Sequence, residues 1–555
     1  MTSARDDLLA LTEEVLAALA NRGMVRRAAR ELDEGRGPEL EVDAGGLVTG
    51  RFPDGVVTRL PPAVTWEAAS CTCAASGVCR HRIALVLAYQ RTAAGAPAAV
   101  RFEPWSPGAF SDEDLEAAVG SRVMAAAMRA LRAGYRARVQ RPSPADPTPR
   151  VELGSCTVRF LVPGAIGYAR SDAARGVRDD AVPLAVWAFR AADELRPEAT
   201  EVELDVGGPE AMVRAEDGSG MEPAVALVAD LLVDGAAHTG PSIDGSIAQT
   251  RRLLEQRNLR WPVDLVDAVA DQLSAYRSRS ARYAAGQFAS LLAELAARHR
   301  CVAGGGVSLP SQVLGTEEAA ETALRHLRLT GIGCRVTGDS ESRTVRVFLA
   351  HGEAGVVLVL ERRWEMEEGE SSIGADLTGR RLAGSTVAVL AAGNVVTDSA
   401  LRSAGRVVRI GTNRVTRTTV AASSGDWGHL PQSLVVRDLN ALSSMLAALP
   451  PRLVRPRVEA DLARVIEIGE MLDLRYESGA QRLTARIRAI DGGTATVSAT
   501  HRALTPGALD ALAAALAGRP RFVSGVIRRF RSDVVVEPLA VVAGGTVVVP
   551  DLAPG

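Results

Sequence analysis

Three of the six cysteines in this 555-residue chain lie within nine residues, and a histidine stands two residues after the last of them. Cys71 and Cys73 form a Cys-x-Cys pair, and Cys79 and His81 form a Cys-x-His pair. Three thiolates and one imidazole are donors that a tetrahedral zinc ion takes in proteins. Because four protein ligands leave no position open for water or substrate, the pattern predicts one structural Zn²⁺.

The segments around these residues indicate how the four ligands are brought together. In an extended segment residues two apart point to the same side, so Cys71 and Cys73 can aim at one point. Ser76 and Gly77 allow the chain to reverse before the second pair. Residues 81–90 contain neither Gly nor Pro and predict a helix whose first turn carries the second pair.

The charge of the site also suits a helix start. A zinc ion with three thiolates has a formal charge of about −1, and a helix N-terminus presents partial positive charge. Arg80 and Arg82 flank the ligands and could offset the same charge. Upstream, residues 39–50 alternate about Gly45-Gly46 and predict a β-hairpin, with further strand at 56–60 and 64–66.

With these strands before it and an apolar helix after it, the segment from about 38 to 90 resembles the SWIM zinc finger. That family has Cys-x-Cys, a variable spacer and then Cys-x-His, matched here by Cys-Thr-Cys at 71–73 and Cys-Arg-His at 79–81. The resemblance implies a zinc-dependent interaction module for protein or DNA. It covers less than a tenth of the chain, and the alternative is a chance grouping or a disulfide with spare thiols.

Composition excludes several enzyme classes. The chain has no lysine, and all 64 basic residues are arginine, a usage that fits a GC-rich bacterial genome. A Walker A lysine, a kinase-type lysine and a Schiff-base lysine are therefore absent. The net charge is −2, without the global basic field of a DNA-coating protein. With few cysteines, no apolar run of membrane-spanning length and no signal peptide pattern, the chain is expected in the cytoplasm.

The remainder predicts a multidomain α+β protein, in which a helix and a ββα SWIM-type finger precede mixed α/β scaffold domains. Predicted helices include 317–328, 436–449 and 459–472, with a strand at 385–391 and hairpins about Asp491 and Gly544. The expected units are an N-terminal helix plus finger (1–95), a basic helix with a Pro-rich linker (96–150), a mixed and then helical region (151–305), a β-rich region (306–430) and a C-terminal α+β region (431–555).

Residues 121–141 carry six arginines and no acid, which predicts a basic helix. It could meet phosphate or an acidic partner, although a core helix with a solvated arginine face is the simpler interpretation. Together with the finger it supports a second hypothesis, nucleic-acid binding. The candidate contacts are Arg80, Arg82, Arg122, Arg129, Arg132 and Arg136.

No catalytic residue is assigned. Ser424, Asp426 and His429 lie close in sequence, but a Gly-x-Ser-x-Gly elbow is absent. His299 and Cys301 could join a second metal or nucleophile site, and isolated cysteines such as Cys156 and Cys334 are common in cores. The leading hypothesis is a non-enzymatic zinc-binding adaptor that recruits a protein or nucleoprotein partner, such as an ATPase supplied in trans. A hydrolase of unrecognised type is the third.

Overall fold

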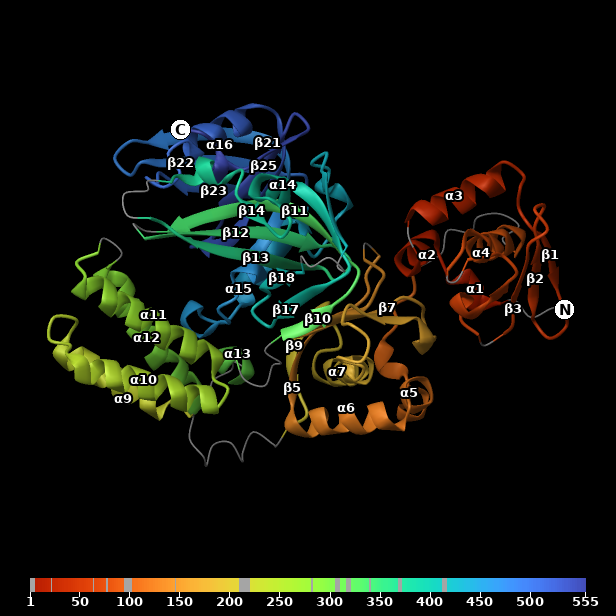
Figure 1. The fold of residues 1–555 in the computed structure, drawn as a ribbon, viewed down its shortest axis with the longest axis horizontal. Helices are drawn as coiled ribbons and strands as arrows, with labels where there is room; N and C mark the ends of the chain where they lie inside the picture. Colours follow the sequence, from red (N-terminus) through yellow and green to blue (C-terminus); the bar gives the residue numbers. More distant parts are fainter. Residues whose placement is uncertain are drawn as a thin grey trace.

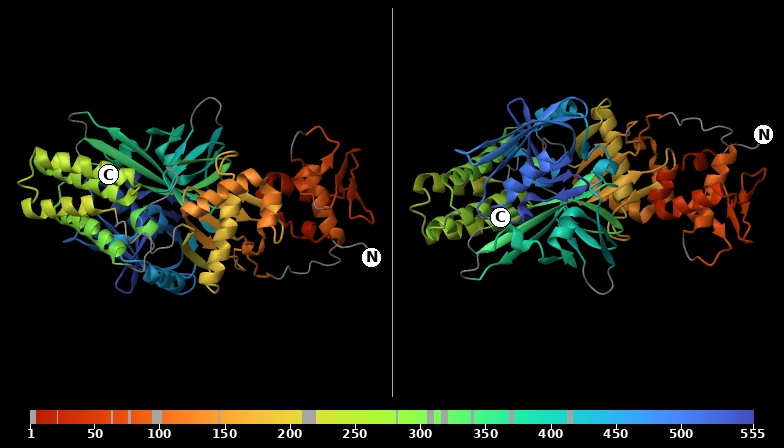
Figure 2. Two further views of the ribbon diagram at one scale, coloured as in Figure 1. Left: turned by 90° about the horizontal axis from the view of Figure 1, so that it is seen from below. Right: turned by 90° about the horizontal axis from the view of Figure 1, so that it is seen from above.

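The computed structural model describes residues 5–20, 22–62, 64–75, 78–93, 102–144, 146–208, 220–280, 283–304, 310–315, 321–338, 341–367, 372–411 and 417–555. They form a multidomain α+β protein with several separate sheets. The N-terminal region lies at one end of the molecule and a group of long helices at the other, with the larger sheets between them (Figures 1 and 2).

The N-terminal region combines three helices with a small sheet. Helices α1 (Asp6–Leu9), α2 (Glu13–Leu19) and α3 (Arg22–Asp33) stand where one amphipathic helix is expected. The antiparallel sheet has the order β1-β2-β3-β4, and helix α4 (Arg80–Ala93) follows it. Its strands are β1 (Glu39–Val42), β2 (Val48–Arg51), β3 (Val57–Leu60) and β4 (Ser70–Cys71).

A second unit follows α4 along the chain. Residues 91–99 contain Ala, Gly and Pro in a pattern that predicts a linker, and they fall mainly outside the described residues, although α4 continues to Ala93. Helices α5 (Asp112–Val119), α6 (Ser121–Ala133) and the buried α7 (Ala181–Leu195) pack with a sheet of order β8-β7-β6-β5-β9. Its strands are β5 (Tyr135–Gln140), β6 (Arg150–Leu153), β7 (Cys156–Phe160), β8 (Ala169–Ser171) and β9 (Glu201–Val206).

This sheet corrects two expectations. The boundary expected at residue 150 falls inside it, because β6 pairs with β5 on one side and β7 on the other. The continuous basic helix expected over 121–141 ends at Ala133, because Gly134 adopts a φ of 84° that breaks the helix. The chain then enters strand β5, which carries Arg136 and Arg138.

A helical region and two further sheets follow along the chain. The helices are α9 (Glu222–Asp234), α10 (Pro241–Gln256), α11 (Arg260–Arg277), α12 (Ala285–Ala303) and α13 (Pro310–Leu314). A five-stranded sheet has the order β13-β12-β11-β16-β19. A three-stranded sheet, β10-β17-β18, joins the same hydrophobic core as β6 and β7.

The strands of these two sheets are β10 (Glu321–Leu324), β11 (Leu327–Gly338), β12 (Ser342–His351), β13 (Val356–Glu365), β16 (Gly393–Thr397), β17 (Ala400–Ser403), β18 (Val408–Ile410) and β19 (Thr418–Ala422). The helix predicted at 317–328 is wrong over its described part, because β10 buries alternate residues and pairs with β17. Of the strand predicted at 385–391, Ser385 and Thr386 form the short strand β15, and the remainder is helix α14 (Val387–Ala392), which Thr386 caps.

The C-terminal sheet contains seven strands, from β20 to β26. They are β20 (Val435–Val436), β21 (Ala463–Glu477), β22 (Arg482–Ala489), β23 (Thr494–Thr500), β24 (Pro520–Phe530), β25 (Asp533–Ala543) and β26 (Thr546–Val548). Helices α15 (Leu439–Ala448) and α16 (Ala508–Ala517) pack on it. The hairpins about Asp491 and Gly544 are confirmed, whereas the helix predicted at 459–472 is mainly strand β21, where Val465 and Ile466 pair with β24.

Candidate metal centre

The four predicted ligands meet in the N-terminal region. Cys71 ends strand β4, Cys73 follows it, and Cys79 directly precedes α4, whose second residue is His81. The three sulfur atoms and one ring nitrogen of His81 all lie within 4.8 Å of one another. Among the described residues this is the one group of at least three such side chains close enough to hold a metal ion. The chain therefore builds a site that could bind one ion.

The histidine is held by a carboxylate outside the cluster. Nε2 of His81 lies 3.1 Å from Oδ2 of Asp54, which stands in the turn between β2 and β3. Nδ1 of the same ring is buried and has no hydrogen-bond partner. Metal-bound histidines commonly donate their other ring N–H to a carboxylate, which fixes the ring and its tautomer. The contact with Asp54 thus leaves Nδ1 as the ring nitrogen available to an ion.

The arginine next to the histidine extends this network. Arg80 donates to Asp54 Oδ2 at 3.0 Å and to Glu31 Oε1 on α3 at 2.8 Å. On the other side, the Phe52 ring lies edge-on to the His81 ring, with 4.8 Å between the ring centroids. The site is thereby tied to α3 and to the β2–β3 turn.

The sulfur atoms experience different surroundings. Burial raises the pKa of the Cys79 thiol to about 11. Burial acts in the same direction on Cys73, but the Ala75 backbone N–H and the neighbouring ligand side chains lower its pKa to about 6. Thr58 Oγ1 donates to the sulfur of Cys71 at 3.3 Å. Negative charge is thus favoured on Cys73, a property that attracts a cation.

The arginines proposed as nucleic-acid contacts are not brought together. Arg80 is held by Glu31 and Asp54, and Arg82 donates to the Glu67 carbonyl at 2.6 Å. Arg136 pairs with Glu203 on strand β9. The exposed residues Arg122, Arg129 and Arg132 remain together on α6 in the second unit.

The other candidate residues lie apart from one another. Ser424, Asp426 and His429 are exposed; His429 Nδ1 contacts the main-chain oxygen of Asp426, and the Asp426 carboxylate lies 3.3 Å from Arg521. His299 and Cys301 lie on α12, in the helical region.

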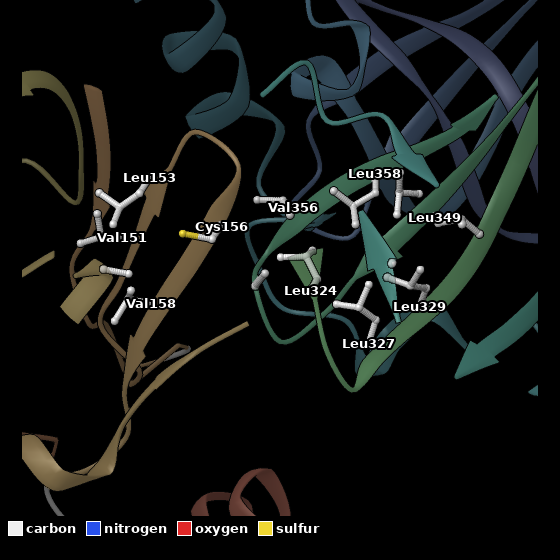
Figure 3. Close-up of a cluster of buried hydrophobic side chains, with 14 of the residues drawn as sticks. Val151, Leu153, Cys156, Val158, Leu324, Leu327, Leu329, Leu349, Val356 and Leu358 are labelled. Carbon is white, nitrogen blue, oxygen red and sulfur yellow. The ribbon is translucent and has the colours of Figure 1, made fainter. Parts of the chain in front are cut away.

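The isolated cysteines are packed in cores. Cys156 is buried on β7 among apolar side chains such as Val151 and Val158, as Figure 3 shows, and burial raises its pKa to about 12. Cys334 on β11 is buried too, and burial raises the pKa of its thiol well above the usual value.

Sequence reasoning missed Asp54 and Glu31, the residues that surround the ligands. Asp54 lies 27 residues before His81, in a turn whose Asp and Gly are typical of any hairpin. Glu31 lies 49 residues before Arg80, on a helix that the sequence connects to the site only by packing. Neither residue has a local motif that would have identified it.

The two domain families that match this chain lie outside this site, whereas one relative is similar to nearly the whole chain. Residues 218–315 match the YehQ four-helical bundle domain, and residues 460–555 match the YehQ C-terminal OB-fold domain. The chain is similar to Protein YehQ of Escherichia coli (strain K12). The two are 29% identical over 561 residues, which cover 97% of this chain and 90% of that protein. No solved structure matches the chain.

These matches agree with the architecture. The match to the four-helical bundle domain spans α9 to α13. The match to the C-terminal OB-fold domain spans β21 to β26 together with α16. Neither covers residues 38–90, so the SWIM resemblance stays a prediction. In the described part of the chain, no helix has both the length and the apolar character needed to cross a membrane.

Proposed function

We propose that the chain is a zinc-binding adaptor whose N-terminal region, about residues 38–90, acts as a SWIM-type interaction module for a protein partner. The observation that carries this proposal is the meeting of Cys71, Cys73, Cys79 and His81 with Asp54 behind the histidine. Three thiolates and an imidazole suit Zn²⁺, and four protein ligands make the ion structural. The scaffold behind the module would present it to the partner.

Two observations favour protein over nucleic acid as the partner. Arg80 and Arg82 are the basic residues nearest the ligands. They already donate hydrogen bonds to Glu31, Asp54 and the Glu67 carbonyl. A phosphate backbone would have to compete with these contacts, whereas affinity for nucleic acid depends mainly on free cationic groups. The position of the region at one end of the molecule leaves it accessible to a second protein (Figure 2).

The proposal is tested by affinity purification of the full chain from its native cytosol. We expect the Cys79→Ser variant to lose the protein partner. Removing the Cys79 thiolate would break the coordination sphere and so disrupt the surface that the bound ion shapes. Cys301→Ser, a thiol on α12 outside the site, is the matched control and keeps the partner. Equal recovery of every partner with both variants would contradict the adaptor function.

A nucleic-acid alternative is tested separately by DNA binding at graded salt concentrations. Phosphate contacts impose a steep decrease of log affinity with log salt. The proposed function predicts weak binding without such a slope. Tight low-salt binding that Cys79→Ser abolishes would favour the alternative.

A further inference from the structure

Two adjoining cavities lie where three distant parts of the chain meet, far from the metal centre in sequence. They are bounded by strands β5, β6 and β9, by the β12–β13 and β17–β18 turns, and by residues 458–464. Arg138, Glu152 and Arg406 line both. Each cavity offers about 30 Å³ to the centre of a water molecule. Because ~10–15 Å³ is enough for one water, the two can hold a group of several atoms.

Most charges around these cavities are matched. Arg406 lies 2.6 Å from Glu152 and 2.8 Å from Asp461, and Arg138 lies 3.0 Å from Glu203. Arg136 pairs with the same Glu203 carboxylate. These contacts join the β5–β9 sheet to the C-terminal region and satisfy the carboxylates that face the first cavity.

Arg150, which lines the second cavity, keeps free donors. It is 5% exposed, and its Nη2 lies 2.5 Å from Asp146. Its Nε and Nη1 atoms are buried and have no hydrogen-bond partner. Nη1 lies against Gly355, where a Cβ atom would approach it to 2.3 Å. Because Gly355 has no side chain, it leaves room for the Nε and Nη1 atoms of Arg150.

Arg464 also lines this cavity and has no ion pair among the described residues. Its Nη1 donates to the main-chain carbonyls of Asp461 and Ala463, each at 2.9 Å. Burial lowers the pKa of Arg464 to about 10, and burial also lowers the pKa of Arg150. Asp146 opposes this effect at Arg150, and Glu201 and Asp461 oppose it at Arg464, but burial outweighs these carboxylates in both cases. An anion beside the free Arg150 donors would favour the charged form, although Glu152 and Glu201 also line this cavity.

We propose that the second cavity binds a small tetrahedral oxyanion of the phosphate or sulfate class between Arg150 and Arg464. Guanidinium groups recognise such anions through several charge-assisted hydrogen bonds. The small volume excludes a nucleotide or peptide. The bound anion would connect strand β6, the β12–β13 turn and strand β21, so it would hold three parts of the chain together. This site is independent of the proposed zinc-dependent function.

The test uses the full chain and inorganic phosphate as the probe, with ionic strength kept constant by sodium chloride. We expect isothermal titration to show one phosphate per chain and the melting temperature to rise with phosphate. Arg464→Met should weaken phosphate binding by about 10- to 100-fold, the usual worth of a charged hydrogen bond. In chloride alone the same variant should be at least as stable as the native chain, because it removes a half-buried charge that has no ion pair among the described residues.

Two further variants keep the outcome clear. Arg150→Lys retains the charge beside Asp146 but loses the guanidinium fork, so phosphate binding should also weaken. Arg528→Met changes an exposed arginine of β24, which pairs with Glu537 outside the cavities, and should leave binding unchanged. Sulfate should compete with phosphate. The proposal is overturned if the native chain gives no phosphate response beyond that of chloride, or if Arg464→Met and Arg150→Lys bind phosphate as tightly as it does.

Discussion

The metal centre and the arginine network around Glu152 collect polar groups from distant parts of one chain, but on very different supports. The sheet beside the metal centre has strands of four residues or fewer, and β4 has two. The network around Glu152 lies beside a core that includes strands β11 to β13, each of ten residues or more. The first region has little sheet to stabilise it, whereas the second is fixed by extensive packing.

The two regions therefore depend on charge in different ways. A short sheet gains much of its stability from an ion that binds the folded form alone. A buried ion network adds little net stability when intact, but it is costly to break because a charge is left without compensation. Five predictions test this contrast.

The largest effect is expected from removing the ion. Structural zinc contributes on the order of 10–16 kcal/mol in finger peptides, so chelation or Cys71→Ser should unfold about residues 38–90. The rest of the chain should stay folded on its own cores. Limited proteolysis should show cleavage confined to the N-terminal region, with Cys301→Ser as the resistant control. An unchanged digestion pattern after chelation would contradict the prediction that the N-terminal region depends on a bound ion for its stability.

A smaller but substantial effect is expected from Glu152→Gln. Glu152 pairs with both Arg402 and Arg406, and Arg402 is fully buried. Arg406 keeps its pair with Asp461, but leaving the buried Arg402 without a carboxylate should cost about 3–5 kcal/mol. Hydrogen exchange of β6 and β17 should accelerate. Glu470→Gln, which removes an exposed pair with Arg488, should change stability by about 1 kcal/mol or less. Equal exchange in both variants would contradict the prediction.

The same carboxylate gives this region a pH dependence. Burial opposes ionisation of Glu152, but the arginine charges outweigh it and hold the pKa of Glu152 below its usual value. A carboxyl whose folded pKa is depressed adds stability above its unfolded pKa of about 4.3 and loses it as pH falls. Denaturation midpoints of the native chain should therefore decrease below that pH. The decrease should be smaller in Glu152→Gln.

The third effect is confined to the metal centre. Asp54→Asn keeps the shape of the side chain but removes the charge that orients His81. Loss of such a partner typically lowers metal affinity by about 10- to 100-fold. Competition with a zinc chelator would measure the change. Glu41→Gln, on the exposed face of β1, is the control and should not alter affinity. Identical affinities would show that the His81–Asp54 contact does not support the ion.

The smallest effect is expected on α6. Replacing Arg122, Arg129 and Arg132 together by alanine removes exposed side chains, so each should shift stability by about 0.5 kcal/mol or less. Retention of the protein partner should be unchanged. Reduced salt dependence of DNA binding in this triple variant would instead assign α6 a phosphate-binding role.

Local spacing was sufficient to predict which four side chains meet at the candidate metal centre, and turn chemistry was sufficient for the hairpins about Asp491 and Gly544. These features depend on residues close in sequence. The His81–Asp54 contact and the pairing of Glu152 with Arg402 depend on tertiary packing, which no local pattern records.

The errors in secondary structure have the same origin. Residues 459–472 and 317–328 have sequences that tolerate a helix, but β21 and β10 form because they complete sheets with β24 and β17. The division of residues 121–141 between α6 and β5 depends on the positive φ of Gly134, which the run of arginines around it does not indicate. Propensity is a weak guide where a distant strand supplies the partner.

The central claim is that Cys71, Cys73, Cys79 and His81 hold one zinc ion. Elemental analysis of the purified full chain tests it most directly. The expected result is one zinc per native chain and per Cys301→Ser chain, with loss of the metal in Cys79→Ser. A native chain free of metal, or a Cys79→Ser chain that retains a full equivalent of zinc, would contradict the account.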